Sequence, residues 1–77
     1  MIEITLVQGH RQIDLLVPRA VRFGRLRQLI LEAFAAKGTA LPDDFSFALD
    51  DKALAVSGYD YISSFGIGNG DRLQIVT

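Results

Sequence analysis

The stretch that decides the fold is Phe65-Gly66-Ile67-Gly68-Asn69-Gly70-Asp71-Arg72-Leu73-Gln74-Ile75-Val76, which Thr77 follows as the final residue. Its glycine-rich first half predicts a turn, because glycine and asparagine adopt a positive φ at little steric cost. In its second half, Leu73 and Ile75 alternate with Gln74, which is typical of a strand with one buried face. We therefore expect the chain to close with a strand that ends flush with its sheet and carries no flexible reactive tail.

Two more strands are expected at the other end of the chain. Apolar side chains alternate with polar ones over residues 2–7 and again over residues 12–17: Ile2, Ile4, Leu6, Ile13, Leu15 and Val17. The polar break between the two runs contains Gly9, as a short hairpin loop requires. The sequence thus predicts a β-hairpin that buries the face carrying these apolar side chains.

A helix is predicted over residues 21–37, after Pro18 ends the second strand by lacking a backbone N–H. Its apolar residues recur at the spacing of one helical face: Phe23, Leu26, Ile30, Ala33 and Phe34. Gly38 just beyond the last turn is a favourable stop signal. Gly24 is a weak point, since glycine costs about 1 kcal/mol relative to alanine in a helix interior.

The middle of the chain predicts a third strand over residues 45–49, a turn at residues 50–52, and a short strand or extended segment over residues 53–56. Residues 57–64 are expected to be irregular, with anchoring side chains at Tyr59, Tyr61 and Ile62. The order β-β-α-β-β-β predicts an α+β fold of the β-grasp type, a mixed sheet of four to five strands crossed by one helix. We expect the first and last strands to pair in parallel at the centre of a single domain covering residues 1–77.

Composition limits the classes of function. The chain has no cysteine, so it holds neither a disulfide nor a thiolate metal site. Its formal net charge of −1 argues against a general nucleic-acid binder, which would carry a strong basic excess. No apolar run reaches the ~18 residues of a membrane span, and the N-terminus lacks the basic leader of a signal peptide. We expect a cytoplasmic protein that neither inserts into a membrane nor binds nucleic acid.

No catalytic pattern emerges from the ionisable and nucleophilic residues. The single histidine, His10, lies in the predicted hairpin turn without a partner that would make it a general base. The aspartate pairs at residues 43–44 and 50–51 supply too few oxygens for a hard cation and fall where turns favour aspartate. The glycine-rich run 66–70 opens a strand, whereas a phosphate-binding loop opens a helix. The sequence predicts no catalytic, cofactor or metal site and therefore no enzyme.

Two surfaces are candidates for partner binding. Arginines cluster at the start of the helix, where cations oppose the positive end of the helix dipole: Arg19, Arg22, Arg25 and Arg27. They form either a solvated face or a patch for an acidic partner, and Arg27 is expected to extend over the core and pair with Asp50 or Asp51. On the outward face of the sheet, a second patch would combine apolar side chains with one arginine: Val7, Leu16, Val76 and Arg72.

The layout of the whole chain resembles ubiquitin, with its short hairpin, Pro18, amphipathic helix, Leu41-Pro42, Phe-rich third strand and Tyr59. The closing run over residues 66–75 is similar to the YukD-type (EsaB-like) ubiquitin-like small proteins of bacterial type VII (WXG100) secretion systems. This resemblance implies an accessory cytosolic protein that binds protein components of the secretion apparatus, membrane-embedded ones included. Its role would be the assembly or the regulation of secretion.

The resemblance also implies a protein that is not conjugated to others. Conjugation by ubiquitin-like modifiers uses a glycine carboxylate on a flexible extension, whereas here Thr77 directly follows Val76. Two alternatives stay open, a sulfur-carrier or modifier protein that serves as an enzyme's substrate and a β-grasp adaptor domain of a longer chain. The oligomeric state, including a homodimer, is open as well.

Overall fold

The N-terminal hairpin forms as its alternating pattern predicts. In the computed structural model, which describes residues 1–77, β1 (Ile2–Gln8) and β2 (Arg11–Val17) pair antiparallel around a turn at Gly9 and His10. Gly9 has a φ of 58°, which glycine adopts without strain. The inward side chains Ile2, Ile4 and Leu6 are fully buried, so this face of the hairpin forms part of the core.

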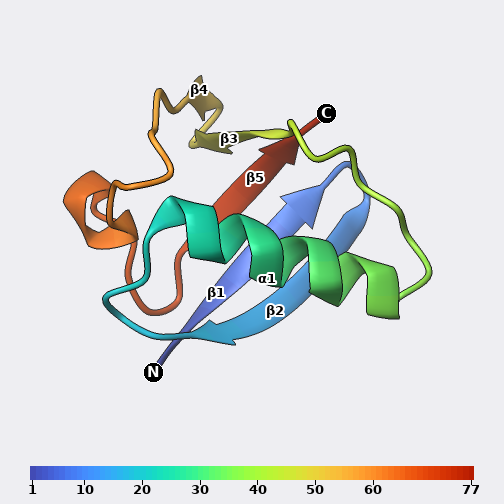
Figure 1. Ribbon diagram of the computed structural model, residues 1–77, viewed down its shortest axis with the longest axis horizontal. Coiled ribbons are helices and arrows are strands. Elements are labelled where there is room, and N and C mark those ends of the chain that lie inside the picture. Colours follow the sequence, from blue (N-terminus) through green and yellow to red (C-terminus); the bar gives the residue numbers. More distant parts are fainter.

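The remaining elements follow in the predicted order. They are α1 (Phe23–Ala36), β3 (Ser46–Leu49), β4 (Lys52–Ala53), the 3-10 helix η1 (Ile62–Phe65) and β5 (Arg72–Val76). The five strands form one mixed sheet in the order β2-β1-β5-β3-β4, with β1 and β5 parallel and the other neighbours antiparallel. Figure 1 shows β5 running through the middle of this sheet. The prediction of an α+β, β-grasp fold with a parallel central pair is confirmed.

One face of the sheet is covered by α1, which crosses it diagonally (Figure 1). The helix contributes Phe23, Leu26, Ile30 and Phe34, each at most 1% exposed, to the hydrophobic core. The rings of Phe23 and Phe47 lie 5.1 Å apart, which joins the first turn of the helix to β3. The opposite face of the sheet has no second layer, because no other element of the chain crosses it.

Two sequence predictions need correction, and a third is refined. Of residues 53–56, predicted to be a short strand or an extended segment, only Ala53 belongs to a strand, the two-residue β4. Tyr59 is 82% exposed and Tyr61 39% exposed, so neither is a buried anchor, whereas Ile62 is buried as predicted. The helix begins at Phe23 because Arg22 is extended and forms an isolated β-bridge with Tyr61.

Gly24 is required by a close approach of two backbones. Its amide donates a hydrogen bond of 3.0 Å to the carbonyl of Gly58, in the loop after β4. A Cβ at Gly24 would lie 3.1 Å from this same oxygen. Gly24, which by its helix propensity is unfavourable in α1, therefore allows the helix to bond directly to the loop.

Candidate functional site

The outer face of the sheet brings together side chains from four strands. The register places Val7 of β1 beside Gln12 of β2 and Gln74 of β5, and Gln74 beside Ala48 of β3. Side chains alternate between the two faces of a strand, so these four residues form one row on the face that α1 does not cover. Ala48 is only 7% exposed although it faces outward.

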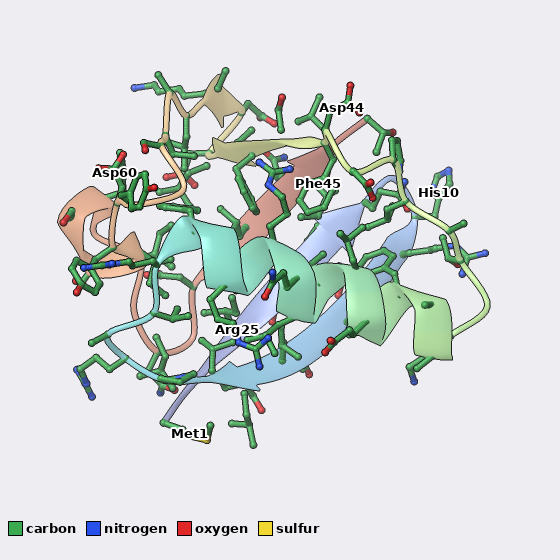
Figure 2. The ribbon with its side chains drawn as sticks, in the orientation of Figure 1. Met1, His10, Arg25, Asp44, Phe45 and Asp60 are labelled. Atoms are coloured by element: carbon green, nitrogen blue, oxygen red, sulfur yellow. The ribbon has the colours of Figure 1, made fainter.

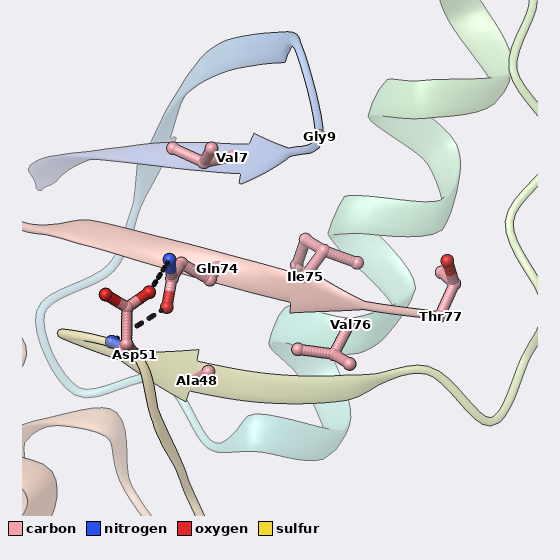
Figure 3. Close-up of a pocket in the computed structure, with 8 residues that line it drawn as sticks. All are labelled: Val7, Gly9, Ala48, Asp51, Gln74, Ile75, Val76 and Thr77. Carbon is pink, nitrogen blue, oxygen red and sulfur yellow. Dashed lines mark hydrogen bonds between the residues drawn. The ribbon is translucent and has the colours of Figure 1, made fainter.

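A shallow hollow of about 460 Å³ lies over this row, from Val7 to Ala48. Its lining consists of Val7, Gly9, Ala48, Asp51, Gln74, Ile75, Val76 and Thr77 (Figure 3). Two hydrogen bonds form one rim: the Asp51 amide donates to Gln74 Oε1 at 3.1 Å, and Gln74 Nε2 donates to Asp51 Oδ1 at 3.0 Å. Because Asp51 is already bonded in this way, the hollow offers a small apolar floor beside a fixed polar rim.

The predicted outer-face patch is brought together only in part. Val7 and Val76 both line the hollow. Leu16, which is 62% exposed, lies opposite Glu3, four residues from Val7 along β1. At ~3.3 Å per residue this separation is about 13 Å, too far for direct contact with Val7. Ala48 is the residue that the prediction omitted, although its alternation with Phe47 and Leu49 already placed it on this face.

Arg72 occupies a different part of the outer face. It pairs in register with Thr5, whose hydroxyl donates a hydrogen bond of 2.8 Å to Asp14 Oδ1 on β2. The row through Asp14, Thr5 and Arg72 is therefore polar, and it separates Leu16 from the hollow.

The predicted arginine cluster does not act as one group. The guanidinium of Arg22 lies 4.9 Å from the centre of the Tyr61 ring, and Arg25 Nη1 donates to Gln28 Oε1 at 3.2 Å. Arg19 is exposed in the turn before the helix. Figure 2 shows Arg25 on the helix side of the sheet, reaching from α1 over β2. Arg25 and the hollow thus lie on opposite faces of the sheet.

Arg27 has a structural role that differs from the predicted one. Its guanidinium lies 4.5 Å from the centre of the Phe45 ring, and its Nη1 donates to the backbone carbonyls of Asp43 and Phe45. The prediction that it pairs with Asp50 or Asp51 is wrong, because the segment leading into β3 supplies the acceptors. Arg27 therefore holds the start of β3 against α1.

Two further observations concern other kinds of site. No group of three or more histidine, aspartate or glutamate side chains is placed so that it would hold a metal ion. Neither helix of the structure combines the length and the apolar character needed to cross a membrane.

A known protein family matches almost the whole chain. The family model described as "WXG100 protein secretion system (Wss), protein YukD" matches residues 1–75. An uncharacterised protein of Clostridium acetobutylicum is 30% identical over 75 residues, which cover 97% of this chain and 81% of that protein.

Solved structures show the same fold. The ubiquitin of Caldiarchaeum subterraneum superposes with a TM-score of 0.71 at 24% identity, covering 99% of this chain and 91% of that one. ATBAG1, solved in complex with HSP70, superposes with a TM-score of 0.76 at 14% identity. In that case the match covers 99% of this chain but only 40% of the other, so the chain spans less than half of that protein. The ubiquitin-like fold expected from the sequence is thereby confirmed.

Proposed function

This chain belongs to the family of the WXG100 secretion system protein YukD, and from this premise we propose that it binds a protein component of such a secretion system. The observation that carries the proposal is the family match, which extends over residues 1–75 and thus over every element of the fold except the last residue of β5. The role is that of an accessory protein in the cytoplasm, in assembly of the apparatus or in regulation of secretion. Residues 1–77 act as a single domain.

The surfaces of the fold support a binding role. Binding patches on small proteins are typically exposed apolar spots rimmed by polar groups. The outer sheet face has this character at the hollow, where Val7, Ala48 and Val76 lie beside the bonded pair Asp51 and Gln74. Such a shallow floor suits a side chain of another protein better than a small molecule, which a deeper and more enclosed pocket would surround.

We also propose that the protein acts without covalent attachment to its partner. Conjugation by ubiquitin-like modifiers uses a glycine carboxylate on a flexible extension, whereas Val76 pairs with Ser46 in the sheet and is held in the fold. We expect a ubiquitin-type activating enzyme supplied with the purified chain and ATP to form no adenylate or thioester. Formation of a covalent enzyme adduct, detected by intact-protein mass spectrometry, would favour a sulfur-carrier or modifier function instead.

Co-purification tests the binding function directly. An affinity-tagged chain is expressed in cells that produce a WXG100 system, and the cytosolic and detergent-solubilised membrane fractions are both passed over the resin. We expect proteins of the secretion system to be enriched, and enrichment to be lost in a strain that lacks the component in question. Secretion of the system's substrates should fall when the gene is deleted and recover when the wild-type chain is restored. If no system component is enriched and secretion is unchanged, the proposed function is wrong.

A further inference from the structure

The strand β2 presents an edge of the sheet that nothing in the chain covers. The amide of Thr5 donates to the carbonyl of Asp71, on the β5 side of β1. Because Thr5 lies opposite Asp14, these two residues form a non-hydrogen-bonded pair, in which the backbone N–H and C=O groups point away from the partner strand. Such pairs alternate along an antiparallel ladder, and the backbone groups of Gln12, Asp14 and Leu16 therefore all point away from β1.

This edge has few of the usual protections of an edge strand. Proteins guard such edges with short strands, prolines, bulges, charged side chains or a covering helix or loop. Of the charged side chains in β2, Arg11 is at its first position, and Asp14 near its centre is hydrogen-bonded to Thr5. β2 is seven residues long, and its register with β1 runs without a bulge from Ile2 opposite Val17 to Gln8 opposite Arg11. No proline occurs before Pro18, which follows the strand. None of the backbone hydrogen bonds outside the helices and strands involves residues 11–17.

Arginines border the uncovered edge on the side of the helix and at both ends. Arg11 is the first residue of β2, and Arg19 follows its last residue by two positions. Arg25 reaches from α1 over the strand, as Figure 2 shows. Of the nearby acidic residues, Asp14 is hydrogen-bonded to Thr5 on the outer face, and Glu32 lies about two turns along the helix from Arg25.

An incomplete apolar floor lies between the edge and the helix. Ile13 and Leu15 point to the helix side of β2, and both remain only half-buried while packing against the core. Leu29 is also half-buried. Because Arg25 precedes Leu29 by four residues, the two side chains lie on the same side of α1. A strand added beside β2 would cover this floor with every second side chain.

We propose that β2 receives an extended, acidic segment of a protein partner as an additional strand of the sheet. Backbone groups of Gln12, Asp14 and Leu16 bond the segment, its apolar side chains cover Ile13, Leu15 and Leu29, and its carboxylates face the arginines. A second copy of the chain is a poorer occupant, because pairing β2 with β2 would bring two sets of arginines together. The inference deepens the proposed function, since it assigns the surface and the chemistry by which a secretion component is bound.

The test uses a fluorescent peptide as long as β2 in which valine alternates with aspartate or glutamate, and binding is followed by anisotropy. We expect saturable binding that weakens as salt is added, since charge complementarity contributes to it. Asp14→Pro removes an outward N–H without removing a β1–β2 bond, and should weaken binding by at least about tenfold. Asp14→Ala removes the same carboxylate but keeps the N–H, and should bind within about twofold of wild type. Circular dichroism checks folding, and Gln12→Pro replaces the variant if Asp14→Pro does not fold.

Side-chain variants test the assigned chemistry. Arg25→Gln should weaken peptide binding several-fold, whereas Arg72→Gln, an equal change of charge on the outer face, should leave it unchanged. Equal binding by wild type and Asp14→Pro would overturn the proposal, as would equal binding of a peptide with lysine in place of the acidic residues. Equal losses in Arg25→Gln and Arg72→Gln, or tighter binding to single-stranded DNA than to the peptide, would also overturn it.

The outcome is separable from that of the proposed function. A secretion component that co-purifies equally with wild type and with Asp14→Pro would disprove the strand-addition surface and leave the binding function intact. Absence of any secretion component from the wild-type sample would disprove the function itself, whatever the peptide result.

Discussion

The two edges of this sheet differ in almost every respect that governs strand pairing. The edge at β2 is seven residues long, uncovered and bordered by Arg11, Arg19 and Arg25. The opposite edge ends in the two-residue β4, and the amide of Leu54 bonds the carbonyl of Phe47 just beyond it. Aspartates flank β3 on both sides, at residues 43–44 and 50–51. One edge is therefore short and flanked by aspartates, and the other is long and flanked by arginines, which favours β2 as the edge that an acidic partner strand would approach.

The largest expected effect is on the free energy of unfolding, and it distinguishes β3, which lies next to the β4 edge, from the β2 edge. Phe47→Ala in β3 should lower the free energy of unfolding by about 3–5 kcal/mol, because it empties a buried site where Phe23, Phe45 and Phe47 pack. Leu16→Ala at the β2 edge should change it by less than about 0.5 kcal/mol, since this side chain is mostly exposed. Urea unfolding of both variants measures the difference. Similar losses in the two variants would show that the β2 edge is packed against something in solution.

A second comparison concerns two arginines of the same helix. Arg27→Gln should cost about 1–3 kcal/mol, because the carbonyl of Phe45 loses a charged donor and two rings lose their cation. Arg25→Gln should cost almost nothing, since its hydrogen bond to Gln28 is exposed. Thermal unfolding of the two variants at one pH provides the measurement. A larger loss for Arg25→Gln would mean that this side chain stabilises the fold and is not held ready for a partner.

The loop that follows β4 provides a third test. Gly24→Ala would gain about 1 kcal/mol from helix propensity alone, but its Cβ would lie 3.1 Å from the Gly58 carbonyl oxygen. We expect a net loss of about 1 kcal/mol, because the two backbones must separate. Gly58→Ala is the matched control, since its Cβ would lie 3.7 Å from the Gly24 Cα, an ordinary contact. A variant Gly24→Ala more stable than wild type would show that the loop is not fastened to the helix.

The smallest predicted effects come from the two hairpin turns. Asp50 and Asp51 have φ values of 51° and 63°, in the left-handed region that favours glycine, whereas the turn of the β2 hairpin has Gly9 at 58°. Asp50→Gly should therefore stabilise by about 0.5–1 kcal/mol, and Gly9→Ala should destabilise by a similar amount. Chemical unfolding resolves both shifts when the two variants are measured in parallel. Opposite signs from those expected would refute the turn geometry.

The sequence predicted the order of the elements along the chain and the buried faces, because these depend on local patterns and on periodicity. The alternation of Ile2, Ile4 and Leu6 and the spacing of Phe23, Leu26, Ile30 and Phe34 specify which faces are buried, and all seven residues lie in the core. Where periodicity is weak, the predictions were less definite or failed. For residues 53–56 the sequence left open a short strand or an extended segment, and only Ala53 belongs to β4. Large aromatic side chains at Tyr59 and Tyr61 suggested burial, yet both lie in a loop on the surface.

The binding surfaces were harder to predict because they depend on contacts between distant segments. Alternation in the sequence correctly assigned Val7, Leu16 and Val76 to one face of the sheet. Only the register shows that Leu16 lies far from the other two. The partner of Arg27 was missed because aromatic rings and backbone carbonyls give no charge signal in a sequence. The uncovered edge of β2 was likewise not predicted, since strand order decides which strand ends the sheet.

The most direct test of whether the β2 edge is free is amide hydrogen exchange in the free protein, followed residue by residue by NMR. We expect the amides of Gln12, Asp14 and Leu16 to exchange rapidly, while those of Ile13 and Leu15 between them are protected by their bonds to β1. Equal protection of all five amides would mean that the outer side of β2 is already paired, and would contradict the claim that this edge is free to receive a partner strand.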